Sequence, residues 1–174
     1  MKFQIIFSGT GGQGMMFIGK LLANLAMDKF PHVTFFPSYG AEVRGGTSNC
    51  QIIVSDKPIA SPIVDAASLQ ILMNQPSVNR FVKSLAVDGT VLVNSSLACC
   101  DDQRAMLVPA SQIAGECGSA QQANVVIFAA ALKKTDLLDR QKARDAVVAM
   151  ASRKGDKAAQ AAAQAFDRGW NFQA

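Results

Sequence analysis

The sequence has few of the side chains on which most active sites depend. Its 174 residues include one histidine, His32, and four cysteines, no two of which have the C-x-x-C spacing. A zinc or iron–sulfur site needs three or four suitably spaced ligands, so we expect this chain to hold no metal. A nucleophilic cysteine paired with His32 stays open as an alternative. Without an export signal, the thiols are expected to be reduced.

Long hydrophobic runs are also missing. No apolar segment reaches the roughly 18–20 residues that a membrane helix needs. The first seven residues hold one lysine and five apolar residues, too few for the hydrophobic region of a secretory signal. Apolar residues make up 49% of the chain and charged residues 17%, which excludes a disordered chain and a coiled coil. We therefore expect one folded domain over residues 1–174, soluble and cytoplasmic, without a membrane contact.

The excess of positive charge is confined to the end of the chain. Residues 1–132 carry eight Lys and Arg against eight Asp and Glu, whereas residues 133–174 carry nine against five, which accounts for the net +4. A nucleic-acid-binding surface would interleave its basic residues with aromatic ones. Here the aromatic residues, Phe166, Trp170 and Phe172, all stand at the end of the basic segment. We expect no nucleic-acid binding and interpret the segment as a solvated helical surface, or one that docks on an acidic partner.

The apolar residues follow two periodicities, those typical of strands and of helices. Short apolar runs predict strands over residues 3–7, 32–36, 50–54, 69–73, 90–94 and 106–109. Helical spacing predicts a helix up to Asp28, a second over about residues 77–85, and helical structure from about Ala120 onward, with a break at Gly155 and an end near Gly169. The alternation predicts an α/β fold: a three-layer Rossmann-like domain with a mostly parallel sheet, helices on both faces and its first two strands parallel.

A glycine-rich turn follows the first predicted strand. Gly9, Gly11 and Gly14 match the G-x-G-x-x-G pattern, in which glycines let the backbone approach an anion and the amides of the next helix attract it. A dinucleotide site also needs an acidic residue about 20 positions further on. The sequence has Phe-Phe-Pro-Ser there, residues 35–38, so we expect no NAD or NADP site. The turn either contacts an anion or cofactor, or only lets the helix pack closely on the sheet.

A second loop, over residues 37–47, follows the second predicted strand. We expect it at the same carboxyl edge of the sheet as the glycine turn, where ligands collect in open α/β sheets. It contains Tyr39, which is the only tyrosine, and the pair Glu42 and Arg44, followed by two glycines. The Arg44 guanidinium can bind a phosphate or a carboxylate. Alternatively, Glu42 and Arg44 brace an irregular loop, as exposed charged pairs often do.

Four segments carry a resemblance to a known family. They read GTGGQGMMFIGKLLANLAM, PSYGAEVRGGTSNCQIIVSDKPIASP, ILMNQPSVNRF and DGTVLVNSSL. In order and spacing they resemble the gamma subunit of the 2-oxoacid:ferredoxin oxidoreductases, over about residues 5–135. The members that this sequence resembles most are those for 2-oxoglutarate and for branched-chain 2-ketoacids such as ketoisovalerate, rather than pyruvate.

The resemblance implies a subunit of a larger enzyme. Such a complex converts a 2-oxoacid and coenzyme A to acyl-CoA and carbon dioxide, and passes electrons to ferredoxin. The resemblance implies that thiamine diphosphate and Mg are held by alpha and beta subunits, and 4Fe-4S clusters by the beta subunit and a ferredoxin-like delta subunit or domain. The gamma chain would hold no cofactor firmly, would lie on the coenzyme A side of the reaction and would not be active alone.

By position, the resemblance implies cofactor-binding residues in three segments, and neither a catalytic residue nor a metal ligand. These residues are Gly11, Gly12, Gln13 and Gly14 in the glycine turn, Ser38, Tyr39, Gly40, Glu42, Arg44, Gly45 and Gly46 in the second loop, and Asn124 at the start of a later apolar helix. The sequence has Ala67-Ser68 where the family commonly has Ala-Asp, and Phe128-Ala129 where it commonly has a glycine. We interpret both departures as packing changes.

Two alternatives to the family interpretation stay open. The chain could be a stand-alone Rossmann-like module that binds a nucleotide or a flavin without partners. It could also be a scaffold subunit that contacts no small molecule. The first would bind its ligand when purified alone, and the second would bind nothing.

Overall fold

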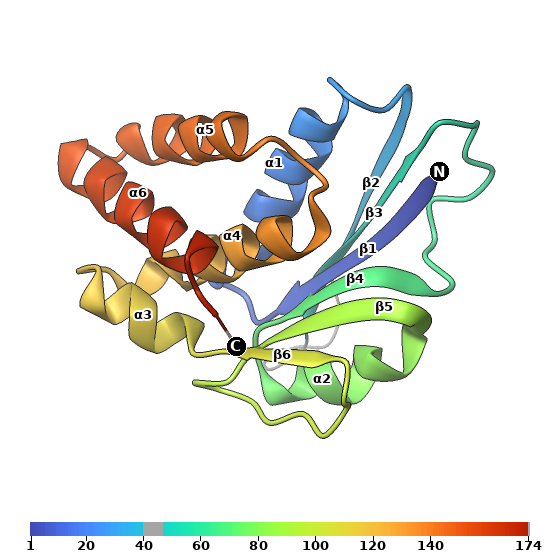
Figure 1. The fold of residues 1–174 in the computed structure, drawn as a ribbon, viewed down its shortest axis with the longest axis horizontal. Coiled ribbons are helices and arrows are strands. Elements are labelled where there is room, and N and C mark those ends of the chain that lie inside the picture. The colour runs from blue at the N-terminus through green and yellow to red at the C-terminus, as the bar shows by residue number, and fades with distance from the viewer. Residues whose placement is uncertain (40–46, 174) are drawn as a thin grey trace.

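The computed structural model describes residues 1–39 and 47–173, and it contains a six-stranded sheet with helices on both faces (Figure 1). The strands are β1 (Lys2–Gly9), β2 (His32–Tyr39), β3 (Ser48–Ser55), β4 (Ala67–Leu72), β5 (Leu85–Asn94) and β6 (Ala105–Val108). The helices are α1 (Met15–Ala26), α2 (Gln75–Phe81), α3 (Ala110–Glu116), α4 (Ala123–Thr135), α5 (Arg140–Ser152) and α6 (Asp156–Trp170). Two short 3-10 helices, η1 (Val82–Ser84) and η2 (Ala120–Gln122), precede β5 and α4. In these ranges no helix is both long and apolar enough to span a bilayer.

The strand order is β2-β3-β1-β4-β5-β6. The pairs β1–β4, β4–β5 and β5–β6 are parallel, whereas β3 pairs antiparallel with both β1 and β2. The predicted α/β fold with a mostly parallel sheet is therefore confirmed, and β1 and β2 point the same way, as expected. They are not neighbours, however, because the chain turns back after β2 and β3 takes the position between them.

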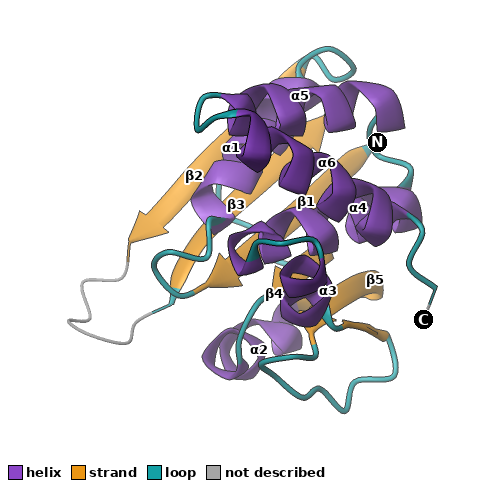
Figure 2. Ribbon diagram, turned by 90° about the vertical axis from the view of Figure 1, so that its left-hand side faces the viewer, coloured by secondary structure: helices purple, strands orange, loops and turns teal. Residues whose placement is uncertain are grey.

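The two faces of the sheet are covered unequally (Figure 2). Successive residues of a strand point to opposite faces, so Ile5 and Phe7 pack with α1 and α4, whereas Ile6 packs with Val64 on the other side. Helices α1, α3, α4, α5 and α6 lie on the first face. On the second face lies α2, whose Val78 packs against β4 and β5. Helices on both faces make the three layers that the sequence predicts.

Helix α4 is the centre of the thicker helical layer. Its first ten residues, Ala123–Leu132, are all buried, as expected for a helix that is apolar all round. Helix α6 crosses α4 closely because Gly169 faces the backbone of Val126. A Cβ at position 169 would lie 2.8 Å from the Val126 carbonyl carbon and closer still to its oxygen. Phe128, at one of the departures from the family pattern, is fully buried in this helix, in agreement with a packing change.

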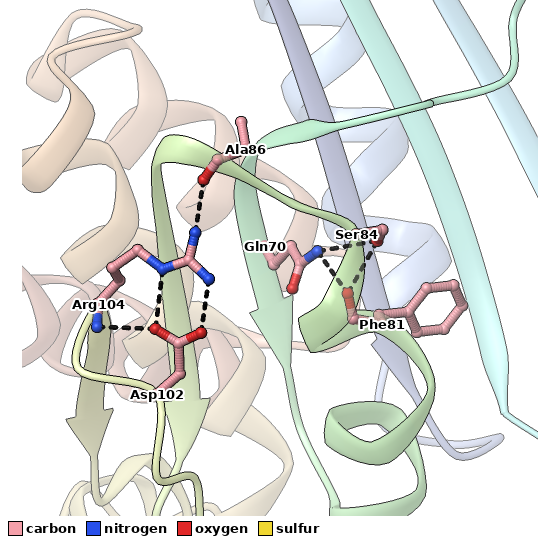
Figure 3. A network of polar contacts seen from close by, with 6 residues as sticks. All are labelled: Gln70, Phe81, Ser84, Ala86, Asp102 and Arg104. Carbon is pink, nitrogen blue, oxygen red and sulfur yellow. Dashed lines mark hydrogen bonds and ion pairs between the residues drawn. The ribbon is translucent and has the colours of Figure 1, made fainter.

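Polar networks hold the connections on either side of β5 (Figure 3). Arg104 forms a bidentate pair with Asp102: its Nε donates to Oδ1 at 2.9 Å and its Nη2 donates to Oδ2 at 2.6 Å. The Arg104 Nη1 donates to the Ala86 carbonyl at 2.7 Å, which links the segment before β6 to the start of β5. Hydrogen bonding from this guanidinium lowers the pKa of Asp102 to about 2. Under α2, the buried Gln70 Nε2 donates to the Phe81 carbonyl at 2.8 Å.

All six predicted strands are present, but their bounds differ from the predicted ones, and two of the differences have an evident structural basis. The strand predicted over residues 32–36 continues through Pro37 to Tyr39. A proline is tolerated there because β2 is an edge strand, where a missing N–H breaks no ladder. The strand predicted over residues 90–94 begins already at Leu85, and its first residues form an irregular pairing with β4.

The helical predictions are confirmed in outline and corrected in detail. The predicted break at Gly155 separates α5 from α6, but a second break occurs at Asp136, whose φ of 50° ends α4. Helix α6 ends at Trp170, which confirms the predicted end near Gly169 to within one residue, and Gly169 itself permits the close packing on α4. The helix predicted over about residues 77–85 is α2 followed by η1. The seven-residue α3 is absent from the prediction.

Candidate functional site

The glycine turn connects β1 to α1 and is stabilised by the side chain of Gln13, which lies within the turn. The Thr10 amide donates to Gln13 Oε1 at 2.7 Å, and the Gln13 amide donates to the Thr10 carbonyl at 3.2 Å. The backbone of Gly12 has φ 89° and that of Gly14 has φ 72°, which favour glycine. Gln13 thus stabilises the conformation of the turn through two hydrogen bonds with Thr10. The amides of Gly12 and its neighbour Gly11 donate no hydrogen bond within residues 1–39 and 47–173, so they are available to an anion.

Asn124 meets this turn from the first residues of α4. The residue is buried, with 7% of its surface exposed; its side-chain Nδ2 donates to the Gly14 carbonyl at 3.4 Å, and its Oδ1 accepts from the Val125 amide at 2.8 Å. A Cβ at position 14 would overlap Asn124 Nδ2. Two of the candidate segments, 110 residues apart, are therefore in contact, and position 14 needs glycine both for its φ and for this contact.

The second candidate loop begins at the same edge of the sheet. Gly9 at the end of β1 and Tyr39 at the end of β2 are both paired with Ser48 of β3. Two strand spacings, about 10 Å, therefore separate the starts of the two loops. Ser38 pairs with Asn49 in the same ladder. The remaining predicted positions, Gly40, Glu42, Arg44, Gly45 and Gly46, lie outside the described residues, as does the side chain of Tyr39.

A groove of about 820 Å³ opens beside the glycine turn. Three distant parts of the chain line it: residues 12–17, residues 117–125 and residues 147–164. Its surface is mainly apolar, with Phe17 and Met150 on its walls, and Lys154 and Lys157 are the charged residues that the described chain contributes. Of the predicted site residues, Gly12, Gly14 and Asn124 line the groove. The two lysines were missed, because the basic composition of residues 133–174 locates the charge in the sequence but not its neighbours in space.

The beginnings of α1 and α4 line the same groove. Their N-cap residues are Gly14 and Gln122, and neither helix has a side-chain cap or an acidic residue in its first turn. The N–H groups of a first helical turn have no partner within the helix and carry partial positive charge. In α4 the Val125 amide already donates to Asn124 Oδ1. The groove therefore combines apolar surface with the start of α1, whose amides attract anions.

The buried thiol of Cys50 lies far from the single histidine, His32. Cys50 is fully buried, its Sγ lies 3.5 Å from the Met15 carbonyl, and burial raises its pKa to about 12. His32 stands at the start of β2, opposite Ser55, five positions along the ladder from Cys50, which is about 17 Å. A nucleophilic pair between these two is therefore wrong. In the described ranges, no three His, Cys, Asp or Glu side chains lie close enough to share a metal ion.

Comparison with known proteins identifies relatives along nearly the whole chain. The family model for pyruvate ferredoxin/flavodoxin oxidoreductase matches residues 4–172. The ketoisovalerate oxidoreductase subunit VorA of Methanothermobacter thermautotrophicus is 37% identical over 150 residues, which are 84% of this chain and 31% of VorA. The 2-oxoglutarate synthase subunit KorC of Methanocaldococcus jannaschii is 28% identical over 155 residues, 85% of this chain and 83% of KorC. The chain thus spans about a third of the length of VorA.

Solved structures share the fold. The gamma subunit of a keto/oxoacid ferredoxin oxidoreductase from Geobacter sulfurreducens has a TM-score of 0.81 at 25% identity, over 98% of this chain and 95% of that one. The 2-oxoglutarate:ferredoxin oxidoreductase from Magnetococcus marinus, solved with 2-oxoglutarate, coenzyme A and succinyl-CoA bound, has a TM-score of 0.83 at 20% identity, over 97% of this chain and 30% of that one. The family resemblance seen in the motifs is thereby confirmed: because only the first three and last two residues lie outside the family match, the chain belongs to the pyruvate ferredoxin/flavodoxin oxidoreductase family.

Proposed function

We propose that this chain is the gamma-type subunit of a 2-oxoacid:ferredoxin oxidoreductase complex. The complex converts a 2-oxoacid and coenzyme A to an acyl-CoA and carbon dioxide, and passes electrons to ferredoxin. The family match over residues 4–172 carries the proposal. The names of VorA, a ketoisovalerate oxidoreductase subunit, and KorC, a 2-oxoglutarate synthase subunit, support a branched-chain 2-oxoacid or 2-oxoglutarate as the substrate.

The lengths of the relatives support a function beside other domains. Only 31% of VorA and 30% of the Magnetococcus marinus chain correspond to this chain, so both proteins contain additional polypeptide next to the shared domain. In the proposed complex, alpha and beta subunits hold thiamine diphosphate with Mg. The beta subunit and a ferredoxin-like delta subunit or domain hold the 4Fe-4S clusters, and ferredoxin is the acceptor.

Within that complex, this chain would supply the coenzyme A side of the reaction. The free amides of Gly11 and Gly12 can donate to a phosphate oxygen, and Asn124 holds Gly14 and the start of α1 in place beside the groove. Arg44, in the loop that begins about 10 Å away, would add a guanidinium contact to a phosphate. None of these groups breaks a bond, so the chain by itself would not turn over a 2-oxoacid.

Co-expression tests the proposal. The chain, carrying an affinity tag, is produced together with the thiamine-binding and cluster-binding subunits of the proposed complex from the same organism. We expect those subunits to copurify, and we expect the complex to reduce a viologen dye with coenzyme A and either 2-oxoglutarate or ketoisovalerate. The tagged chain alone should show no such reduction. Turnover by the isolated chain, or its purification without any thiamine-binding subunit, would contradict the proposal, and a flavin or nucleotide bound to the isolated chain would favour the stand-alone module.

A further inference from the structure

Lys154, in the turn between α5 and α6, and Lys157, in α6, differ from the arginines within these two helices. Arg144 binds Asp167 at 2.8 Å, and Arg168 binds a glutamate of α3 at 2.6 Å. In the part of the chain that the structure describes, no carboxylate lies within 4.0 Å of the amine of Lys154 or Lys157. Their charges are therefore not neutralised by ion pairs of this kind.

The groove around them contains no acidic side chain among its described residues. Among residues 1–39 and 47–173, nineteen line it, none of them Asp or Glu, and the two lysines carry the charge of these residues. Asp156 lies between them in the sequence but is not one of the lining residues. A groove of this volume whose charged side chains are all positive selects for an anionic ligand.

Other lining residues add hydrogen-bond donors that attract anions. Gly12 and Gly14 border the groove, so amides at the start of α1 and lysine amines, about 140 residues apart in sequence, line one space. Apolar surface lines the same groove and includes Phe17, which is 42% exposed in spite of its size. The arrangement fits a ligand with both a strongly anionic part and an apolar part.

We propose that Lys154 and Lys157 bind the phosphate groups of an organic phosphate in this groove, with the apolar part of that ligand against Phe17 and Met150. This inference rests on the proposed function, in which coenzyme A is a substrate handled by this chain. It adds two binding residues that lie far from the glycine turn in sequence and that contribute positive charge to the same groove.

Calorimetric titration of the full chain tests the inference. The variant Lys154→Gln/Lys157→Gln is titrated with coenzyme A and with pantetheine, which has the same thiol end but no phosphate. We expect the double substitution to weaken coenzyme A binding by about 10- to 100-fold, because charge-assisted contacts are lost. Pantetheine binding should not change. Added salt should weaken coenzyme A binding to the wild-type chain more than to the variant.

The matched control is Lys133→Gln/Lys134→Gln, which removes the same charge from the exposed end of α4, outside the groove. It should bind coenzyme A as the wild-type chain does. Equal loss in both variants, equal affinity of the groove variant and the wild-type chain, or no coenzyme A binding by the wild-type chain would each overturn the inference. The proposed function is tested separately by the co-expression experiment. If coenzyme A binding depends on the two lysines but no thiamine-binding subunit copurifies, the proposed complex is refuted while the proposed phosphate site is retained.

Discussion

The contact between Gly14 and Asn124 allows a quantitative test of how the glycine turn is held. Gly14 has a φ of 72°, and the space where a Cβ would stand is taken by the Asn124 amide. Gly14→Ala therefore introduces two separate penalties. One is the strain of a left-handed backbone with a side chain, and the other is the displacement of Asn124 from the Gly14 carbonyl and the Val125 amide.

The size of each penalty follows from general values. The left-handed conformation costs a residue with a Cβ about 1–2 kcal/mol. Each of the two hydrogen bonds contributes about 0.5–1.5 kcal/mol. We therefore expect Gly14→Ala to lower the free energy of unfolding by about 2–5 kcal/mol, and Asn124→Ala by about 1–3 kcal/mol. In the double variant the hydrogen bonds are lost only once, so it should be more stable than the sum of the single effects by about 1–3 kcal/mol.

Urea unfolding at constant temperature measures all three variants, provided that the slope with denaturant stays the same. Gly12→Ala is the matched control in the same turn, because its φ is 89° but no atom lies within 4 Å of its Cβ position. It should lose only the backbone penalty of about 1–2 kcal/mol. Strictly additive effects of Gly14→Ala and Asn124→Ala, or equal losses for Gly14→Ala and Gly12→Ala, would refute the steric coupling.

Three further predictions concern other parts of the molecule. Gly169→Ala should destabilise the chain by about 1–3 kcal/mol through overpacking, because its Cβ would overlap the Val126 carbonyl. Gly115→Ala in α3, with no atom within 4 Å, should be neutral or slightly stabilising, and a reversed order in thermal unfolding would contradict this packing. The pKa of Asp102, about 2, lies below that of an unfolded aspartate, so its pair with Arg104 stabilises the fold above about pH 4 and loses that effect as pH falls toward 2. Asp102→Asn should therefore reduce the loss of unfolding free energy between about pH 4 and 2. An unchanged pH dependence in this variant would disprove the contribution of the pair. Iodoacetamide at about pH 8 should modify the exposed Cys99 in the native chain and Cys50, with its pKa of about 12, only after unfolding; early labelling of Cys50, read by peptide mass, would contradict its burial.

Local features of the sequence determined the fold class and the glycine turn. The apolar run Phe3–Phe7 predicts a buried strand, and Gly9, Gly11 and Gly14 follow it. Apolar residues at helical spacing come next. Neighbouring residues alone therefore predict a strand, a turn and a helix. The family motifs are likewise contiguous, so the resemblance depends only on residues that are close together in the chain. At Gly169 the local pattern located the end of α6 to within one residue, but it did not show that this glycine faces the backbone of Val126.

Only the tertiary structure decided which of these segments meet. A strand's own residues do not specify its neighbours, so the insertion of β3 between β1 and β2, and with it the spacing of the two candidate loops, follows from the pairing of the whole sheet. Asn124 reaches Gly14 because α4 is buried at the centre of the helical layer. From the sequence, Lys154 and Lys157 were interpreted as solvated surface charge. They line a groove because α5 and α6 pack back onto α4, so that residues of their connecting turn and of the glycine turn border the same space. Contacts of this kind depend on packing between residues more than a hundred positions apart, which periodicity and spacing along the chain do not encode.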